Sequence, residues 1–184
     1  MVVGIIIAVV LIGLVIYLIS AYNGLIRRRN QVENAWSQID VQLKRRLDLI
    51  PNLVETVKGY AAHEQETLDA VISARNQAIE APVTPHEQAE ADGVLTGALR
   101  QLFALGEAYP DLKANQNFLQ LLEELTATEG RVAYARQFYN DSVLDYNNKL
   151  EQFPTVVFAR MLRFDRREYF EADEAARTAP TVEF

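Results

Sequence analysis

The sequence contains no cysteine and only two histidines, His63 and His86. The lack of cysteine excludes disulfide bonds, thiolate zinc sites and cysteine nucleophiles. His63-Glu64 begins like the zinc-protease helix motif, but that motif needs a second histidine four residues after the first, and position 67 is threonine. The sequence also lacks a glycine-rich phosphate loop and a nucleophile elbow. We therefore expect no catalytic residues, no metal site, no cofactor and no enzyme activity.

The sequence has fewer basic than acidic residues. It contains 18 Lys and Arg residues and 25 Asp and Glu residues, which gives a formal net charge of −7. Proteins that bind nucleic acid neutralise backbone phosphates with clustered Lys and Arg. A chain this acidic is therefore not expected to have a nucleic-acid partner.

One segment has no charge at all, residues 2–19, with the sequence VVGIIIAVVLIGLVIYLI. About 18 apolar residues are near the minimum for a helix that crosses a bilayer, and interfacial tyrosines such as Tyr17 and Tyr22 often flank such a span. A cleaved signal peptide would need basic residues before the run and small residues at the cut site. Nothing basic precedes the run, and Ile19-Ser20-Ala21 fits poorly. We predict an uncleaved transmembrane anchor over residues 1–21.

The basic residues Arg27, Arg28 and Arg29 follow this run directly, and Lys44-Arg45-Arg46 comes next. Lys and Arg close to a span are retained on the cytoplasmic side of the membrane. We expect the N-terminus outside and the C-terminal domain in the cytoplasm. Two readings of the first three arginines stay open: a topology signal alone, or additional pairing with anionic lipid headgroups.

Residues 22–154 show apolar residues at spacings of three and four, and no alternating strand pattern, so the predicted fold is all-α. Pro51 lies within this region, and a proline inside a helix kinks or ends it. The apolar stripe continues in register across Pro51, which favours a kink, whereas Asp48 could begin a short connection between two helices. We predict a break at Pro51 that gives two helices of similar length.

Two further helices follow. The sequence Thr84-Pro85-His86-Glu87 is a capping box that predicts a helix start near Pro85, and Tyr109-Pro110 predicts its end. The last long helix is predicted from about residue 117 to 151, with Pro154 stopping it. Four helices with short connections predict an up-and-down antiparallel four-helix bundle over residues 22–154.

Residues 155–184 form a segment of a different kind. We predict a short amphipathic helix in it, followed from Glu171 by an extended tail. Two roles stay open for this helix, which could lie on the membrane surface or cover the open end of the bundle. Its predicted apolar face holds Val157, Met161 and Phe164, and its predicted basic face holds Arg160, Arg163 and Arg167.

Polar residues lie beside the apolar stripes of the first and last bundle helices, where they need a partner or lose solvation. They either fix the register between helices or form a surface for self-association or a partner. On the first helix they are Asn34, Asp40, Arg45, Arg46 and Asp48, and on the last they are Glu129, Arg136, Asn140 and Asn147.

Several of these residues stand in motifs that resemble those of the LemA family. The motifs are Tyr22-Asn23-Gly24-Leu25, NAWSQIDVQLKRR over residues 34–46, DLIPNLV over residues 48–54, Tyr109-Pro110-Asp111-Leu112, Thr128-Glu129, ARQFYND over residues 135–141, Tyr146-Asn147, and Phe153-Pro154. The resemblance implies a bacterial protein anchored in the inner membrane, with an up-and-down four-helix bundle and no catalytic residues. It also favours a helix junction at Pro51. Family members are often encoded near a membrane zinc metalloprotease or an acidic TPM-type membrane domain, and the first of these nominates a membrane protease as a partner.

Two functions are therefore expected. The first is a membrane-anchored helical scaffold that contacts lipid, forms a homo-oligomer, and organises or remodels the bilayer. The Gly4-x-x-x-Ala8 spacing supports it, because small residues four apart let membrane helices approach closely. The alternative is an adaptor or regulator for a membrane protease or an envelope-stress pathway, with the anchor supplying only proximity.

Overall fold

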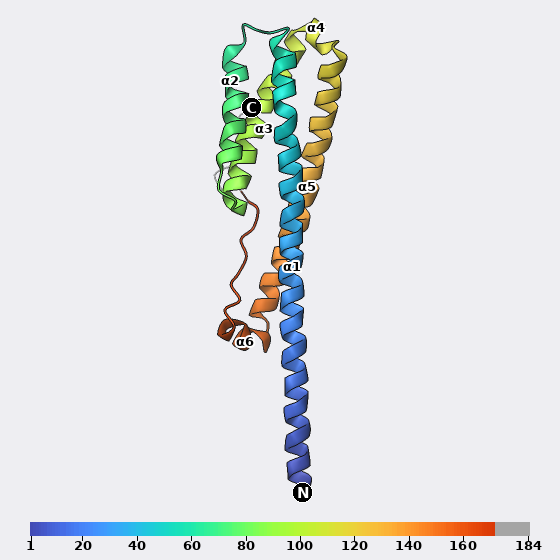
Figure 1. The fold of residues 1–184 in the computed structure, drawn as a ribbon, viewed down its shortest axis with the longest axis vertical. Coiled ribbons are helices and arrows are strands. Elements are labelled where there is room, and N and C mark those ends of the chain that lie inside the picture. The colour runs from blue at the N-terminus through green and yellow to red at the C-terminus, as the bar shows by residue number, and fades with distance from the viewer. Residues whose placement is uncertain (172–184) are drawn as a thin grey trace, which may run out of the picture. The chain divides into compact units, whose positions relative to one another are not determined.

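The structure is a computed structural model that describes residues 1–171, and every regular element in that part of the chain is helical. The helices are α1 (Val2–Lys58), α2 (Gln65–Glu80), α3 (Pro85–Ala108), α4 (Pro110–Lys113), α5 (Gln116–Glu151) and α6 (Thr155–Met161) (Figure 1). The predicted all-α fold with a long apolar N-terminal helix is confirmed. The extended tail predicted from Glu171 lies outside the described residues after that position.

The chain divides into two compact units, and both α1 and α5 contribute to each. Unit 1 consists of Met1–Ser37 and Phe138–Arg167, which are the N-terminal part of α1, the C-terminal part of α5, and α6. Unit 2 consists of Gln38–Gln137 and the chain from Glu168 onward, and it contains all of α2, α3 and α4.

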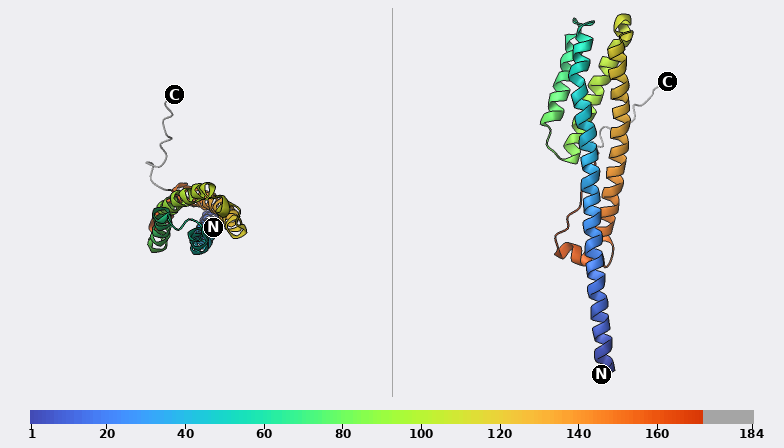
Figure 2. Two further views of the ribbon diagram at one scale, coloured as in Figure 1. Left: turned by 90° about the horizontal axis from the view of Figure 1, so that it is seen from above. Right: turned by 45° about the vertical axis from the view of Figure 1, so that its right-hand side comes forward.

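Unit 2 is a bundle in which α1, α2, α3 and α5 run in alternating directions, joined by short loops (Figure 1). Helices α2 and α3 lie side by side, as both views in Figure 2 show. All four long helices and α4 contribute to one apolar core, in which each fully buried Leu or Ile side chain stabilises the fold by about 1.5–3 kcal/mol. The core includes Ile50, Leu53, Val57, Leu68, Val71, Leu95, Leu99, Leu102, Leu112, Phe118 and Leu125.

In unit 1, α1 packs against the C-terminal part of α5. The rings of Trp36 and Tyr139 meet with centroids 5.6 Å apart, and Arg28 forms a 2.8 Å ion pair with Asp145. The apolar stripe between the two helices consists of Ala21, Leu25, Val32, Ala35, Val143, Tyr146 and Leu150, all of which are buried.

The predicted break at Pro51 is wrong, because α1 continues through this residue to Lys58. A proline has no N–H to donate to the carbonyl four residues earlier, which here belongs to Leu47. The side chain of Arg75, on α2, donates its Nε–H to that carbonyl oxygen at 3.1 Å. The tertiary contact replaces the missing helical bond, and the exposed proline ring lies at the surface. The chain turns at 59–64 instead.

The predicted limits of the later helices are confirmed. Thr84 is the N-cap of α3, its Oγ1 accepting from the Glu87 N–H at 3.4 Å and donating to the Glu87 carboxylate at 2.6 Å. The helix ends before Pro110, and α5 spans almost the predicted range. The single turn α4 was not predicted.

The predicted amphipathic helix is shorter than expected. It ends at Met161 as α6, so Arg163 and Arg167 do not share a helical face with Arg160, and that prediction is wrong. The N–H of Phe164 donates to the carbonyl of Ala159, and the N–H of Arg163 donates to that of Arg160. These two bonds, with Arg163 at φ 55, make a Schellman motif, which closes a helix.

Candidate functional site

The N-terminal part of α1 is the first feature of the site. Within the described part of the chain, α1 is the one helix that is long and apolar enough to cross a membrane. Every residue from Val2 to Ser20 is exposed, whereas the core helix of a soluble domain would be mostly buried. An exposed apolar stretch of this length needs an apolar surrounding, which a bilayer provides.

A second exposed apolar surface lies on and beside α6, in the same unit. Val157 and Met161 lie one turn apart on α6 and are 63% and 76% exposed, and Phe153, just before the helix, is 84% exposed. Leu162, directly after it, is also exposed. Together these four residues form what we call the α6 apolar surface. The opposite side of α6 is anchored by Thr155 and Ala159, which are buried.

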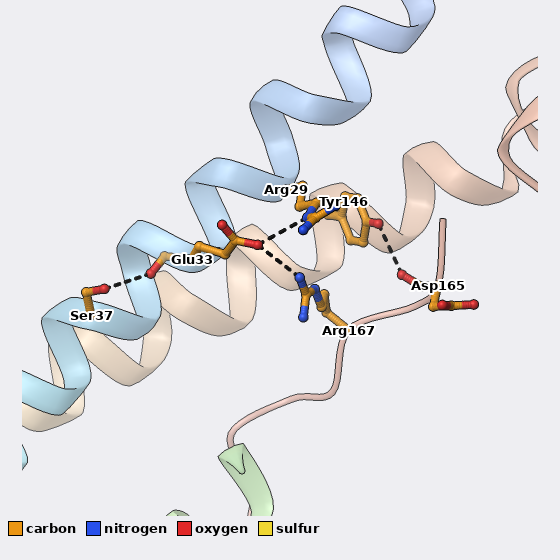
Figure 3. Close-up of polar contacts among 6 residues, drawn as sticks. All are labelled: Arg29, Glu33, Ser37, Tyr146, Asp165 and Arg167. Carbon is orange, nitrogen blue, oxygen red and sulfur yellow. Dashed lines mark hydrogen bonds and ion pairs between the residues drawn. The ribbon is translucent and has the colours of Figure 1, made fainter. Parts of the chain in front are cut away.

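The chain after α6 is held against α5 by hydrogen bonds to its backbone, of which the one from Tyr146 is drawn in Figure 3. Asn147 donates from Nδ2 to the carbonyl of Arg167 at 2.9 Å, and its Oδ1 accepts from the N–H of the same residue at 2.9 Å. The hydroxyl of Tyr146 donates to the carbonyl of Asp165 at 3.1 Å. Asn147 and Tyr146 are both buried on α5, so the segment's path is set by fixed groups.

The same segment also contacts α1. The ring of Phe164 meets that of Tyr22 edge-on, with centroids 5.9 Å apart. Glu33 accepts from Arg29, also on α1, and from Arg167, each at 3.1 Å, and so joins the two segments (Figure 3). Tyr22 directly follows the predicted anchor, residues 1–21. The contact therefore brings the segment after α6 to the base of the apolar part of α1.

The basic residues predicted near the membrane are all in unit 1. Arg28 pairs with Asp145, Arg29 and Arg167 share Glu33, and Arg27, Arg160 and Arg163 are exposed. Arg166, which the sequence reading missed, pairs with Glu151 at 2.8 Å. A cavity of about 220 Å³ is lined by Arg29, Arg163, Arg166 and Arg167 together with Tyr146, Phe164 and Asp165. Burial raises the pKa of Tyr146, and the charges of Arg167 and Arg29 lower it to a smaller extent.

The charge of the chain is unevenly divided. Unit 1 holds eight Lys and Arg residues and five Asp and Glu residues, a net charge of +3, so the rest of the chain carries −10. The unit with the membrane-spanning candidate is therefore the basic one. Among the described residues, no three His, Asp or Glu side chains gather in a way that could hold a metal ion.

Comparison with known proteins places the chain in a family. The family model described as the LemA family matches residues 35–184. The protein belongs to the LemA family. The resemblance read from the sequence motifs is thus confirmed, and with it association with a membrane.

Three relatives align with most of this chain. Protein LemA of Metamycoplasma hominis is 30% identical over 158 residues, which is 84% of this chain and 71% of the relative. Magnetosome protein MamQ of Magnetospirillum gryphiswaldense is 26% identical over 193 residues, covering 91% and 71%. Magnetosome protein MamQ 2 of Paramagnetospirillum magneticum is 26% identical over 186 residues, covering 88% and 68%.

The polar residues of the LemA motifs lie in different places. Asn147 is buried and holds the segment after α6, as described above, and Asn140 is half-buried on α5. Asn34, Asp40, Arg45 and Asp48 are exposed on α1, where Asp48 lies 3.5 Å from Lys44. Arg46, Glu129 and Arg136 line one cavity in unit 2.

That cavity includes two residues that sequence reasoning missed, Asp92 and Arg100. Asp92 could have been found from the sequence, because it lies three residues before Leu95. This spacing places it on the same face of α3 as the buried leucines. Arg46 donates from Nη1 to Asp92 Oδ1 at 2.6 Å, and both side chains are largely buried, at 3% and 11% exposed. Burial raises the pKa of Asp92, and the charge and hydrogen bond of Arg46 offset only part of that effect.

Proposed function

We propose that this protein is a non-enzymatic membrane-anchored scaffold that self-associates and thereby organises or remodels the membrane. In this proposal α1 spans the cytoplasmic membrane of a bacterium, with the N-terminus outside and the helical bundle in the cytoplasm. The observation that carries it is the α6 apolar surface, which is tied to the base of the apolar part of α1 by the contact between Phe164 and Tyr22.

This arrangement supports a second attachment to the bilayer, beside the span itself. Val157, Met161 and Phe153 are exposed next to arginines, which is the composition of a helix that lies in the membrane interface. Each of these side chains gains up to about 1.5–3 kcal/mol when it is fully buried in an apolar environment. The exposed Arg160 and Arg163 add attraction to anionic headgroups, worth about 1 kcal/mol for each residue near the surface.

The proposed orientation follows from the charge of unit 1. Arg27, Arg28 and Arg29 come within a few residues of the span, and the folded chain brings the arginines after α6 to the same unit. Lys and Arg near a span stay on the cytoplasmic side.

Self-association is supported by the membrane segment. Gly4 and Ala8 are one turn apart on α1, and a Cβ added at Gly4 would meet nothing within 4 Å. The small face is therefore open for a neighbouring helix in the bilayer. The MamQ relatives are named as magnetosome proteins.

The mass of the full-length protein, extracted into native-lipid nanodiscs, tests self-association. A discrete oligomer is expected, and Gly4→Leu should reduce its size. Gly13→Leu is the matched control, because Gly13 is also open but lies outside the Gly4-Ala8 pair. A monomer or dimer in the unmodified protein would contradict the scaffold. The adaptor for a membrane protease would then be the better explanation, to be tested by crosslinking in cells.

Contact of the α6 apolar surface with lipid can be tested separately. Because the chain has no cysteine, a single Met161→Cys variant takes one environment-sensitive fluorophore. The emission of this probe should shift to the blue in bilayers that contain anionic lipid. The same probe on Asn148→Cys, an exposed position on α5 outside the α6 apolar surface, should shift less. Equal emission from the two positions would contradict membrane contact by this surface.

A further inference from the structure

A polar cavity of about 470 Å³ lies in unit 2, between α1, α3 and α5. Its volume is in the range of pockets that bind small molecules. It opens to solvent, because Arg100, Glu129 and Arg136 at its edge are exposed, and it ends inside the bundle at Arg46. The membrane attachment proposed above makes no use of it.

The base of the cavity holds an incompletely bonded arginine. The Arg46 side chain is 97% removed from solvent, and its Nη1 donates to Asp92. Its Nε is buried and has no hydrogen-bond partner among the described residues. A buried donor without a partner is costly, and a guanidinium presents its Nε–H in the fork that matches an oxyanion. The cavity supplies the space in which such a group could reach Arg46.

Two more arginines stand at the edge of the same cavity. In the part of the chain that the structure describes, neither Arg100 nor Arg136 forms an ion pair or a hydrogen bond. With Arg46 they give three positive charges, against two negative charges on Asp92 and Glu129. The cavity is thus locally positive in a unit that is strongly negative. A positive concavity of this kind attracts small anions.

Glycines keep the wall of the cavity open. Gly93 and Gly97 lie one turn apart on α3, and a Cβ added at either would meet nothing within 4 Å. A glycine inside a helix is less favourable than alanine. Internal packing does not require these glycines, whereas larger side chains would fill the space beside Arg46.

We propose that this cavity binds the phosphate group of a small molecule, with Arg46 at its base and Arg100 and Arg136 at its edge. On binding, the Arg46 guanidinium turns its Nε–H, which is shielded from solvent in the structure, toward one phosphate oxygen, and the two outer arginines bind the others. Asp92 and Glu129 are placed to accept hydrogen bonds from hydroxyl groups of the same molecule, which favours a phosphate ester over free phosphate.

Calorimetric titration of the full-length protein in phosphatidylcholine nanodiscs tests the proposal, at constant ionic strength and in a buffer without phosphate. The probes are glycerol 3-phosphate, inorganic phosphate and glycerol. Saturable binding of the first two and none of glycerol is expected. Tighter binding of glycerol 3-phosphate would identify an ester, which includes a lipid headgroup, and equal binding would identify free phosphate. No saturable binding of either phosphate would overturn the proposal.

Two variants locate the binding. Arg100→Gln removes an exposed charge-assisted bond and should raise the Kd about tenfold. Arg131→Gln removes the same charge from an exposed position outside the cavity and should leave the Kd within about twofold. Gly93→Leu should abolish binding by filling the cavity, while Gly130→Leu, also open but outside the cavity, should not. Unchanged binding in both Arg100→Gln and Gly93→Leu would overturn the proposal.

Discussion

The hold of Asn147 on the segment after α6 leads to a quantitative prediction. Its side-chain amide makes two hydrogen bonds with the backbone of Arg167, each 2.9 Å long and part-buried. A hydrogen bond of this type contributes about 1 kcal/mol, and a group left unsatisfied and buried costs about 1–3 kcal/mol. Asn147→Ala should therefore favour opening of the segment by about 2–3 kcal/mol, roughly a 30- to 150-fold change in the opening equilibrium.

Hydrogen exchange of the Phe164 amide measures this opening, because its bond to the Ala159 carbonyl belongs to the same segment and is not removed by the substitution. The full-length protein in nanodiscs should show faster exchange at that amide, by about the factor given above. Helical content measured by circular dichroism should stay nearly the same, because Asn147 lies near the C-terminal end of α5, where little helix follows it, and alanine is a strong helix former.

Asn148→Ala is the matched control. Asn148 is the next residue of α5, its side chain is exposed, and no hydrogen bond of that side chain is formed with described residues. Exchange at the Phe164 amide should change little in this variant. If the two variants exchange equally, or if Asn147→Ala changes the rate less than threefold, the segment is held mainly by its other contacts and the reasoning is refuted.

Three further results are expected. Asp92→Ala leaves Arg46 buried without its partner and should cost about 3–5 kcal/mol, a fall of ~6–20 °C in Tm by calorimetry; a fall under about 2 °C would contradict a buried pair. Because burial holds the pKa of Asp92 in the folded chain above its ordinary value of 3.8, protonation favours folding. The stability of the wild type relative to Asp92→Asn should fall as pH rises from 3.8 through the folded-state pKa, and a rise there would contradict the sign. Arg75→Gln leaves the Leu47 carbonyl unpaired and should lower the free energy of unfolding by about 1–2 kcal/mol. The loss should be much smaller in a Pro51→Ala background, where residue 51 again has an N–H to donate to that carbonyl. Equal losses in both backgrounds would show that Arg75 does not replace the missing helical bond.

The sequence predicted the helices well where their ends depend on local chemistry. Thr84 and Pro85 set the start of α3 through a capping interaction between near neighbours, and the stop before Pro110 needs only the ring of that proline. Pro51 shows the limit of such reasoning. The bond that keeps α1 intact comes from Arg75, 28 residues after the carbonyl it reaches, and no local pattern indicates it.

The candidate site divides in the same way. The sequence predicted that these arginines lie near the membrane. It did not predict which acidic residues pair with them. Arg28 meets Asp145 across 117 residues, and Arg167 meets Glu33 across 134. Such pairs depend on the relative placement of α1 and α5 within unit 1, which residue spacing alone does not specify. The missed Asp92 is different, because its position on the stripe of α3 was readable.

Arg163 is the residue whose conformation the sequence was least able to predict, and it gives a test of the membrane proposal. It occupies the left-handed region at φ 55, where glycine is usual and another residue costs about 1–2 kcal/mol. Arg163→Gly should therefore slow exchange of the Phe164 amide, which bonds to Ala159, by about five- to thirtyfold. Arg163→Ala keeps the strained backbone and should not slow it. If the arginine is present for its charge, both variants should weaken the response of a probe at Met161 to anionic lipid. A full lipid response in the stabilised Arg163→Gly variant would show that the charge has no part in membrane contact.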